Sequence, residues 1–328
     1  MKVFVTRKFP GDFLEELKKN NFVVDVSEFD RPLTPEELLE KTSGVDAIIS
    51  VLSDKIDGEL MDAIGPQLKV ISNYAVGFDN INIVDATERG IIVTNTPCEE
   101  VNEAVAEHAW ALIASLTRRI VEADEATRRG AYKGWDPDIF LGTSLIGKTL
   151  GIIGLGQIGT MVARRAIGYK MNILYNKRKK DEEAEKKYGV SFSDLDSLLS
   201  QSDIVTLHVP LTEETHHMIN KESLSKMKKG SFLINTARGP VVDEHDLALS
   251  LKDGHLAGAA LDVFDNEPAI DPELVGMENV ILTPHIASAT NEAREAMGKL
   301  AVLGILDTFS SKKPINLVNV EVWDKRRN

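Results

Sequence analysis

Three polar residues of complementary chemistry, Arg238, Glu267 and His285, each follow a short apolar segment in the second half of the chain. Open parallel sheets place their ligands at such positions, just beyond the carboxyl ends of strands. An arginine fork grips a carboxylate with two hydrogen bonds, and a histidine paired with a carboxylate is suited to donating a proton near neutral pH. Reduction of a 2-oxo acid requires these groups. Arg238 would anchor the substrate carboxylate, His285 would protonate the new alkoxide, and Glu267 would orient His285.

Each of the three residues also has an ordinary structural interpretation. An arginine before Gly-Pro is common in solvated turns, and a glutamate before a proline often ends a strand. Six other histidines compete for the acid–base role: His108, His208, His216, His217, His245 and His255. We expect His208 to flank a cofactor because it ends a predicted strand, and we expect His216 and His217 to lie at the surface. Residue chemistry alone leaves these alternatives open.

A glycine-rich turn near the middle of the chain organises this region. The apolar run Thr149–Ile153 predicts a strand buried on both faces, and Gly154, Gly156 and Gly159 follow it with G-x-G-x-x-G spacing. The first glycine permits a tight turn, the second lets a pyrophosphate approach the backbone, and the third lets the next helix, expected from Thr160, pack on its strand. A turn without a ligand can share this spacing. The strand before it and the helix and second strand after it favour a dinucleotide site.

Strands and helices alternate on both sides of this turn, which predicts two doubly wound parallel-sheet α/β domains. Strands are expected near residues 3–6, 45–52, 68–72, 91–94, 150–153, 172–175, 204–208, 231–235, 257–262 and 280–283. Thr34, Pro35 and Glu37 predict a capped helix start. Residues 100–129 lack Gly and Pro and predict one long connector or subunit-contact helix. Trp135 follows in a loop, where an aromatic residue packs locally or on a partner subunit.

Composition narrows the class of protein. The net charge of −13, from 51 acidic and 38 basic side chains, argues against nucleic acid as a partner. No apolar run approaches the roughly 20 residues of a membrane span. Cys98 is the only cysteine, so we expect no intrachain disulfide and a cytoplasmic location. Loop packing is a more ordinary role for Cys98 than nucleophilic catalysis. No cluster of metal ligands is evident, and we expect no metal.

The chain resembles the D-isomer-specific 2-hydroxyacid dehydrogenase family, and within it the glyoxylate/hydroxypyruvate reductases. Matching segments occur in family order over nearly the whole chain: Asn73–Asn80, Gly154–Gly159, His208–Thr212, Ile234–Asp243, Leu261–Phe264, Glu267–Pro268 and Pro284–Thr290. The resemblance implies an NAD(P)-dependent enzyme whose catalytic residues are Arg238, Glu267 and His285. It also implies a flavodoxin-like substrate domain formed by residues 1–98 and 287–328, and a Rossmann-type nucleotide domain formed by residues 99–286.

The resemblance implies further roles and agrees with the cofactor roles already expected of the glycines and His208. The backbone of Val76 and Gly77 would bind the substrate carboxylate, and Leu52 would line a small pocket. In a homodimer, the neighbouring subunit would lend Trp135 to the active site. Asp262 would face the nicotinamide. The glycine turn and the loops after two later strands would supply other cofactor contacts: Gly154, Gly156, Gln157, Ile158, Gly159, His208, Val209, Pro210, Thr215 and Ala237.

The nucleotide preference is predicted from a basic loop. NAD-preferring folds place an acidic residue about 20 residues beyond the glycines, but this chain has Lys177, Arg178 and Lys179 there, with no carboxylate before Asp181. We therefore expect NADP(H) to be preferred and NAD(H) to be possible. The alternative is a solvated basic loop that tolerates either nucleotide.

The expected substrate is a small 2-oxo acid, glyoxylate or hydroxypyruvate, and the alternative within the family is another D-2-hydroxy acid. Phosphite dehydrogenases place a lysine where Val76 stands, which disfavours that reaction. The rival from another class is a nucleotide-dependent binding protein like the C-terminal-binding corepressors, which share the fold and the three polar residues. Turnover separates the two.

Overall fold

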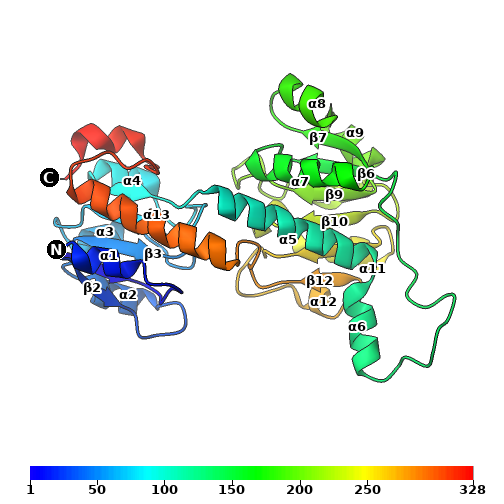
Figure 1. Ribbon diagram of the computed structural model, residues 1–328, viewed down its shortest axis with the longest axis horizontal. Coiled ribbons are helices and arrows are strands. Elements are labelled where there is room, and N and C mark those ends of the chain that lie inside the picture. The colour runs from blue at the N-terminus through cyan, green and yellow to red at the C-terminus, as the bar shows by residue number, and fades with distance from the viewer. Residues whose placement is uncertain (328) are drawn as a thin grey trace. The chain divides into compact units, whose positions relative to one another are not determined.

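The computed structural model describes residues 1–327, which form two compact units (Figure 1). The first unit contains Met1–Val101 and the chain from Thr290 onward, and the second contains Asn102–Ala289. The chain therefore crosses between units after residues 101 and 289, within three residues of the bounds at 98 and 286 that the resemblance implies. Each unit is an α/β domain built on one parallel sheet, which confirms the predicted fold class.

The first unit has a five-stranded sheet in the order β2-β1-β3-β4-β5, the flavodoxin-like arrangement. Its strands are β1 (Lys2–Val5), β2 (Val23–Val26), β3 (Ala47–Ser50), β4 (Val70–Asn73) and β5 (Ile92–Thr94). The edge strand β2 does not stand out in the sequence, because its residues are exposed or half-buried instead of uniformly apolar. The central strands β3 and β4 are buried throughout.

The helices of this unit are α1 (Leu14–Lys19), α2 (Pro35–Thr42), α3 (Gly58–Ile64), α4 (Ile83–Glu88) and α13 (Asn291–Phe309), followed by the 3-10 helix η2 (Val320–Lys325). The predicted capping box of α2 is present: Thr34 accepts from the Glu37 amide, and the Glu37 side chain accepts from the Thr34 amide. The C-terminal helix α13 packs on β4, where the Ser72 hydroxyl donates to the Ala301 carbonyl at 2.9 Å. The end of the chain thus completes the first unit.

The second unit has a seven-stranded parallel sheet in the order β12-β11-β10-β9-β6-β7-β8. Its strands are β6 (Thr149–Ile153), β7 (Asn172–Asn176), β8 (Ser191–Phe192), β9 (Ile204–Leu207), β10 (Phe232–Asn235), β11 (Gly258–Leu261) and β12 (Val280–Leu282). Its helices are α5 (Glu99–Thr117), which begins in the first unit, α6 (Ile120–Arg128), α7 (Gln157–Gly168), α8 (Glu182–Tyr188), α9 (Leu195–Gln201), α10 (Lys221–Lys226), α11 (Glu244–Lys252) and α12 (Pro272–Val275), with the 3-10 helix η1 (Gly239–Val241).

Helices cover both faces of this sheet. On one face, side chains of α5 and α7, including Trp110 and Val162, pack on Leu150 and Ile234; Figure 1 shows these two helices side by side across the strands. On the other face, α9, α10, α11 and α12 contribute a second apolar cluster. Burial on both faces explains why the strands read as continuous apolar runs.

The predicted single helix over residues 100–129 is wrong: α5 ends at Thr117 and α6 begins at Ile120. Between them Arg119 has a left-handed backbone, with φ 54°. The Thr117 carbonyl accepts a hydrogen bond from the Thr143 amide at 2.7 Å, and Gly142 packs so closely that a Cβ there would lie 2.5 Å from that carbonyl oxygen. A distant loop therefore ends the helix, which local propensity does not reveal.

None of the helices in the described part of the chain combines the length and the apolar character needed to cross a membrane.

Candidate active site

The carboxyl ends of three neighbouring strands carry the three predicted catalytic residues. The strands β10, β11 and β12 are paired in parallel, with Asn235 opposite Leu261 and Leu261 opposite Leu282. Arg238, Glu267 and His285 follow the ends of these strands by a few residues, so the sheet brings the three segments to one edge.

His285 and Glu267 contact each other directly. The His285 Nδ1 atom lies 2.9 Å from Glu267 Oε2, and both side chains are about one-third exposed. The Phe264 amide donates to the other oxygen, Oε1, at 3.1 Å. Burial acts to raise the pKa of Glu267, but the hydrogen bond and charge of His285 and the Phe264 amide outweigh burial, and the pKa is lowered. Glu267 is therefore a carboxylate held against one nitrogen of the imidazole.

The Asp262 carboxylate fixes the turn that carries His285. It is fully buried, and it accepts from the Thr283 hydroxyl at 2.6 Å and from the amides of Ile286 and Ala287 at 2.9 and 2.7 Å. Burial acts to raise its pKa, but the donors, including His108, lower it overall. His285 itself has φ 53°, and its amide donates to the Asp262 carbonyl at 2.8 Å. The nicotinamide contact expected of Asp262 stays a prediction beside this structural role.

Arg238 lies at the N-terminus of η1, directly after a turn braced by Asn235. The Asn235 side chain accepts from the Ala237 amide at 3.0 Å and donates to the Arg238 carbonyl at 2.9 Å. The next residue, Gly239, packs against the Phe264 carbonyl so tightly that no Cβ fits. The backbone that carries Arg238 thus abuts the segment that leads to Glu267. The Arg238 guanidinium, which is half-buried, donates to the Ala237 carbonyl at 2.7 Å.

The glycine turn has the geometry that its spacing predicts. Gly154 has φ 100°, and a Cβ at Gly159 would lie 2.2 Å from the Gly154 carbonyl oxygen, so the helix can approach its strand only through a glycine. A Cβ at Gly156 would meet nothing within 4 Å. Helix α7 begins at Gln157, three residues before the predicted start, and Gly156 provides no side-chain cap. The first amides of a helix have no partner within it, so this open turn fits a nucleotide phosphate.

The remaining residues predicted to contact the cofactor lie on loops after β9 and β10. Val209 packs beside Gly154, and the Thr215 hydroxyl donates to the Pro210 carbonyl at 2.7 Å, which closes the loop between them. Ala237 is buried in the turn described above. His208 is half-buried as a residue. Its Nδ1 atom is buried and has no hydrogen-bond partner in the described chain. Burial lowers the pKa of His208 to about 4.

The basic loop after β7 is partly neutralised. Lys177 Nζ lies 2.9 Å from Asp181 Oδ2, and the same carboxylate caps α8, whereas Arg178 and Lys179 are exposed. Asn176 ends β7 at the position where an acidic residue would hold ribose hydroxyls, and its side chain donates to the Ser193 carbonyl at 2.9 Å. No carboxylate of the chain precedes Asp181 in this loop.

In the first unit, hydrogen bonds brace the loop that was predicted to bind the substrate carboxylate. The Asn95 side chain donates to the Val76 carbonyl at 2.7 Å, and the Asn73 side chain donates to the Gly77 carbonyl at 2.9 Å. Both carbonyls are thereby held within the domain. Leu52 is 37% exposed, which leaves its side chain available at the surface of this unit.

Trp135 and the remaining histidines differ in their surroundings. Trp135 is 85% exposed, so local packing does not explain it. His216 is exposed, as predicted, but its neighbour His217 is half-buried and lies between Asp243 and Asp265, at 3.6 and 3.4 Å. His108 contacts Thr283, His255 contacts the Met227 carbonyl, and His245 is exposed. Among residues 1–327, no three His, Cys, Asp or Glu side chains are grouped to hold a metal ion.

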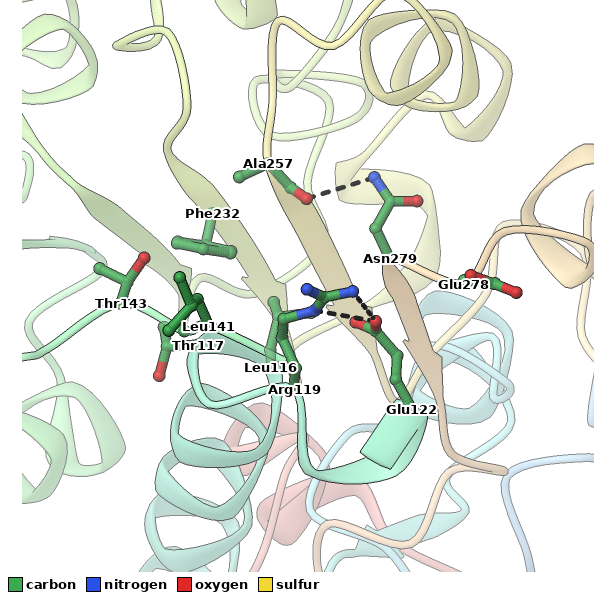
Figure 2. A pocket seen from close by; sticks show the side chains of 11 residues that line it. Leu116, Thr117, Arg119, Glu122, Leu141, Thr143, Phe232, Ala257, Glu278 and Asn279 are labelled. Carbon is green, nitrogen blue, oxygen red and sulfur yellow. Dashed lines mark hydrogen bonds and ion pairs between the residues drawn. The ribbon is translucent and has the colours of Figure 1, made fainter. Parts of the chain in front are cut away.

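A separate pocket lies at the opposite edge of the same sheet, where strands begin (Figure 2). Phe232 starts β10, and Ala257 and Asn279 immediately precede β11 and β12. The Arg119 guanidinium on its wall is paired with Glu122 at 2.6 Å. This pocket contains none of the residues predicted to do chemistry, and the candidate active site is the carboxyl edge.

Sequence inspection overlooked several residues that hold the site: Asn235, Thr283, His108 and Glu244. Each is polar, buried or half-buried, and hydrogen-bonded to a loop that bears a predicted site residue or to the residues holding such a loop. For Asn235, Thr283 and Glu244 the available signal was a polar residue at the end of a buried strand or at a helix start, which also fits a turn or a cap. His108 lies inside α5 and carried no such signal.

This arrangement suits proton transfer at one nitrogen of His285. Because Nδ1 faces the Glu267 carboxylate, Nδ1–H donates to that carboxylate and Nε2 is left to exchange a proton with a substrate oxygen. An arginine on the neighbouring loop supplies positive charge for an anionic group. A site with these parts can protonate an alkoxide while an acid group of the same molecule is held.

Comparison with known proteins identifies the family. Residues 110–287 match the family model described as the D-isomer specific 2-hydroxyacid dehydrogenase, NAD binding domain. The chain belongs to the D-isomer-specific 2-hydroxyacid dehydrogenase family, and it is an oxidoreductase whose second unit is an NAD(P)-binding domain.

Particular relatives match nearly the whole chain. A glyoxylate reductase of Thermococcus kodakarensis is 47% identical over 99% of this chain and 98% of its own length. A glyoxylate reductase of Thermofilum pendens is 50% identical over 99% of this chain and 96% of its own. An NADPH-dependent glyoxylate/hydroxypyruvate reductase of Sinorhizobium meliloti, solved in complex with NADP and malonate, has a TM-score of 0.83 and 32% identity, covering 98% of this chain and 97% of that one.

We expect Gly156→Ala to weaken nucleotide binding without unfolding the protein. The new methyl group would meet open space in the protein but would occupy the place of a phosphate. The free energy of unfolding should change by less than about 1 kcal/mol, while the Kd for nucleotide, measured by calorimetry, should rise by at least about tenfold. Gly159→Ala is the contrasting variant, because its methyl group collides with the Gly154 carbonyl and should destabilise the fold itself. Unchanged affinity in Gly156→Ala would place the phosphates elsewhere.

The buried His208 should make stability depend on pH. Its pKa is lowered from 6.5 to about 4, so between these values the unfolded chain binds a proton that the folded chain does not. The free energy of unfolding should therefore fall as pH decreases from about 6.5 to 4, by on the order of 2 kcal/mol from this group. Urea unfolding of wild type and His208→Gln should show a difference between them that changes over this range. A pH-independent difference between these two proteins would rule the effect out, and the exposed His245→Gln provides a control for the substitution.

Proposed function

We propose that the protein reduces small 2-oxo acids, glyoxylate and hydroxypyruvate, to 2-hydroxy acids of D configuration, with NADPH as the preferred reductant. The observation that carries this proposal is the 2.9 Å contact between His285 Nδ1 and Glu267 Oε2, on the edge of the sheet that also bears Arg238. The glyoxylate reductases that align with nearly the whole chain support the same substrates.

In the proposed reaction, Arg238 binds the substrate carboxylate and His285 Nε2 faces the keto oxygen. A bound nicotinamide nucleotide supplies the hydride for the carbonyl carbon. The carbonyl π pair moves to oxygen, and Nε2 delivers its proton there, which leaves His285 neutral and still bonded through Nδ1 to Glu267. The negative charge of Glu267 stabilises the imidazolium before transfer. The backbone of Val76 and Gly77 and the side chain of Leu52 are proposed to complete substrate binding.

The nucleotide is proposed to bind with its phosphates at the amides of Gly156, Gln157 and Ile158. Nearby loops contribute His208, Val209, Pro210, Thr215 and Ala237. The exposed Arg178 and Lys179, together with Lys177, are proposed to bind the 2′-phosphate of NADPH, since guanidinium and ammonium groups are suited to that dianion. The absence of a carboxylate between β7 and Asp181 supports this preference.

A homodimer is proposed to form through α6 and the loop that follows it. Figure 1 shows this loop extending from its own domain, and it exposes the large apolar side chains Tyr132, Trp135, Leu141 and Ile146. Large apolar side chains left exposed on one loop are typical of a protein interface. We propose that Trp135 reaches the partner's substrate site.

Oxidation of NADPH by glyoxylate or hydroxypyruvate, followed by absorbance, tests the reaction. His285→Ala should lower kcat/KM by about a thousandfold, as expected for the loss of a general acid, and Glu267→Gln should lower it less. The exposed His245→Ala provides the matched control and should retain activity. If both nucleotides bind to the wild-type protein but neither is consumed with any 2-oxo acid, a binding protein of the same fold is the better explanation.

Nucleotide preference is tested at Arg178. Loss of a charge-assisted contact should raise the KM for NADPH in Arg178→Ala by about tenfold or more, while the KM for NADH stays within about twofold. Lys180→Ala removes a neighbouring cation that is paired with Glu185 at 3.1 Å, and it should alter neither constant. A wild-type KM for NADH equal to or below that for NADPH would overturn the proposed preference.

A further inference from the structure

The loop that carries Glu267 is closed at both ends by one buried side chain. Glu244 is 8% exposed; its Oε1 accepts from the Asp265 amide at 2.7 Å, and its Oε2 accepts from the Asp271 amide at 3.2 Å. Glu267 lies between these two residues in the chain. A single carboxylate thus bridges the start and the end of this segment.

The ordinary function of a glutamate at this position does not explain these contacts. Glu244 is the first residue of α11, where acidic side chains commonly bind the free amides of the helix. In this helix Asp243 performs that role, since it accepts from the Asp246 amide at 3.0 Å. Both oxygens of Glu244 are directed instead to another segment of the chain.

Helix α11, which carries Glu244, is packed into the core. The same helix places Leu247 and Ala248 in the apolar cluster on one face of the sheet, and Phe264, just before the bridged segment, belongs to that cluster. Inside the segment, the Ala269 amide donates to the Asn266 carbonyl at 2.9 Å. The Phe264 amide then binds Glu267 directly at 3.1 Å. A continuous series of contacts therefore joins the helix to the Glu267 carboxylate and, through it, to His285.

Charged groups of the bridged segment lie close to Glu244. The pKa of Glu244 is raised, chiefly by burial. The two amide donors act to lower this pKa, and the carboxylates of Asp265 and Asp271 act to raise it further. The His217 ring lies between the carboxylates of Asp265 and Asp243, at 3.4 and 3.6 Å.

We infer that Glu244 is a positioning residue for the proposed reaction: by bridging the amides of Asp265 and Asp271 it holds Glu267 in register with His285. This inference rests on the proposed function only for its effect on turnover. The effect on the Glu267–His285 pair is independent of substrate.

Glu244→Gln is the test variant, because glutamine has the same shape but only one oxygen to accept from two amides. We expect kcat for glyoxylate to fall by between about 10- and 100-fold, as for a small misplacement of a catalytic group, with KM changed by less than about threefold. Glu273→Gln, on the exposed start of α12, makes the same chemical change and should leave both constants at wild-type values.

A second measurement does not depend on activity. In the substrate-free full-length protein, NMR of labelled histidine should show the His285 ring titrating at lower pH in Glu244→Gln than in wild type, in the direction also expected of Glu267→Gln. Amide hydrogen exchange at Asp265 and Asp271 should accelerate. If Glu244→Gln is unfolded by circular dichroism, the shorter but charged Glu244→Asp replaces it in both measurements, with the same direction of change expected.

A wild-type His285 titration together with wild-type kcat in the folded variant would overturn the inference. A variant with lower thermal stability but unchanged His285 titration would also overturn it, since the role would then be structural only. If the wild-type enzyme turns over no 2-oxo acid while the His285 titration still shifts, the proposed substrate fails and the positioning role stands.

Discussion

The buried carboxylate of Asp262 is the constraint on which the geometry of the site depends. Removing a carboxylate from water is costly unless donors replace the lost hydration. Here the donors come from the turn after β12: the Thr283 hydroxyl and the amides of Ile286 and Ala287. Satisfying that charge requires the turn to fold in one way, and it holds His285 at φ 53°. The left-handed backbone of His285 is thus held by hydrogen bonds to a fully buried carboxylate.

Two other buried polar side chains hold loops of the site in the same way. Asn235 holds the turn before Arg238, and Glu244 closes the segment around Glu267. In each case a rigid strand or helix carries the anchoring side chain, and a loop carries the functional group. Parallel strands supply the common edge, and buried polar side chains decide where each loop points from that edge.

The amino edge of the same sheet shows how distant contacts override local preference. Residues 100–129 have the composition of one helix. However, the Thr143 amide donates a hydrogen bond to the Thr117 carbonyl, and Arg119 has a left-handed backbone. The outcome is a separate helix α6 followed by a loop with exposed apolar side chains, including Trp135. The break redirects the chain, and it is the feature on which the proposed dimer contact rests.

The sequence by itself determined the strands buried on both faces, the glycine turn at 154–159, the capping box at Thr34 and the two parallel-sheet domains. These features depend on local patterns: apolar runs, required glycines and side chains that bind amides three residues away.

The sequence did not reveal the edge strand β2, whose residues are too exposed to form such a run. The sequence proposed that Glu267 orients His285, but only the tertiary structure decided the atoms and the distance of that contact, the break at Arg119 and the bridge made by Glu244. Those contacts join residues 18 to 27 positions apart or depend on a loop beyond the helix. No local pattern encodes them, because they form only when the strands align and exclude water from the groups between them.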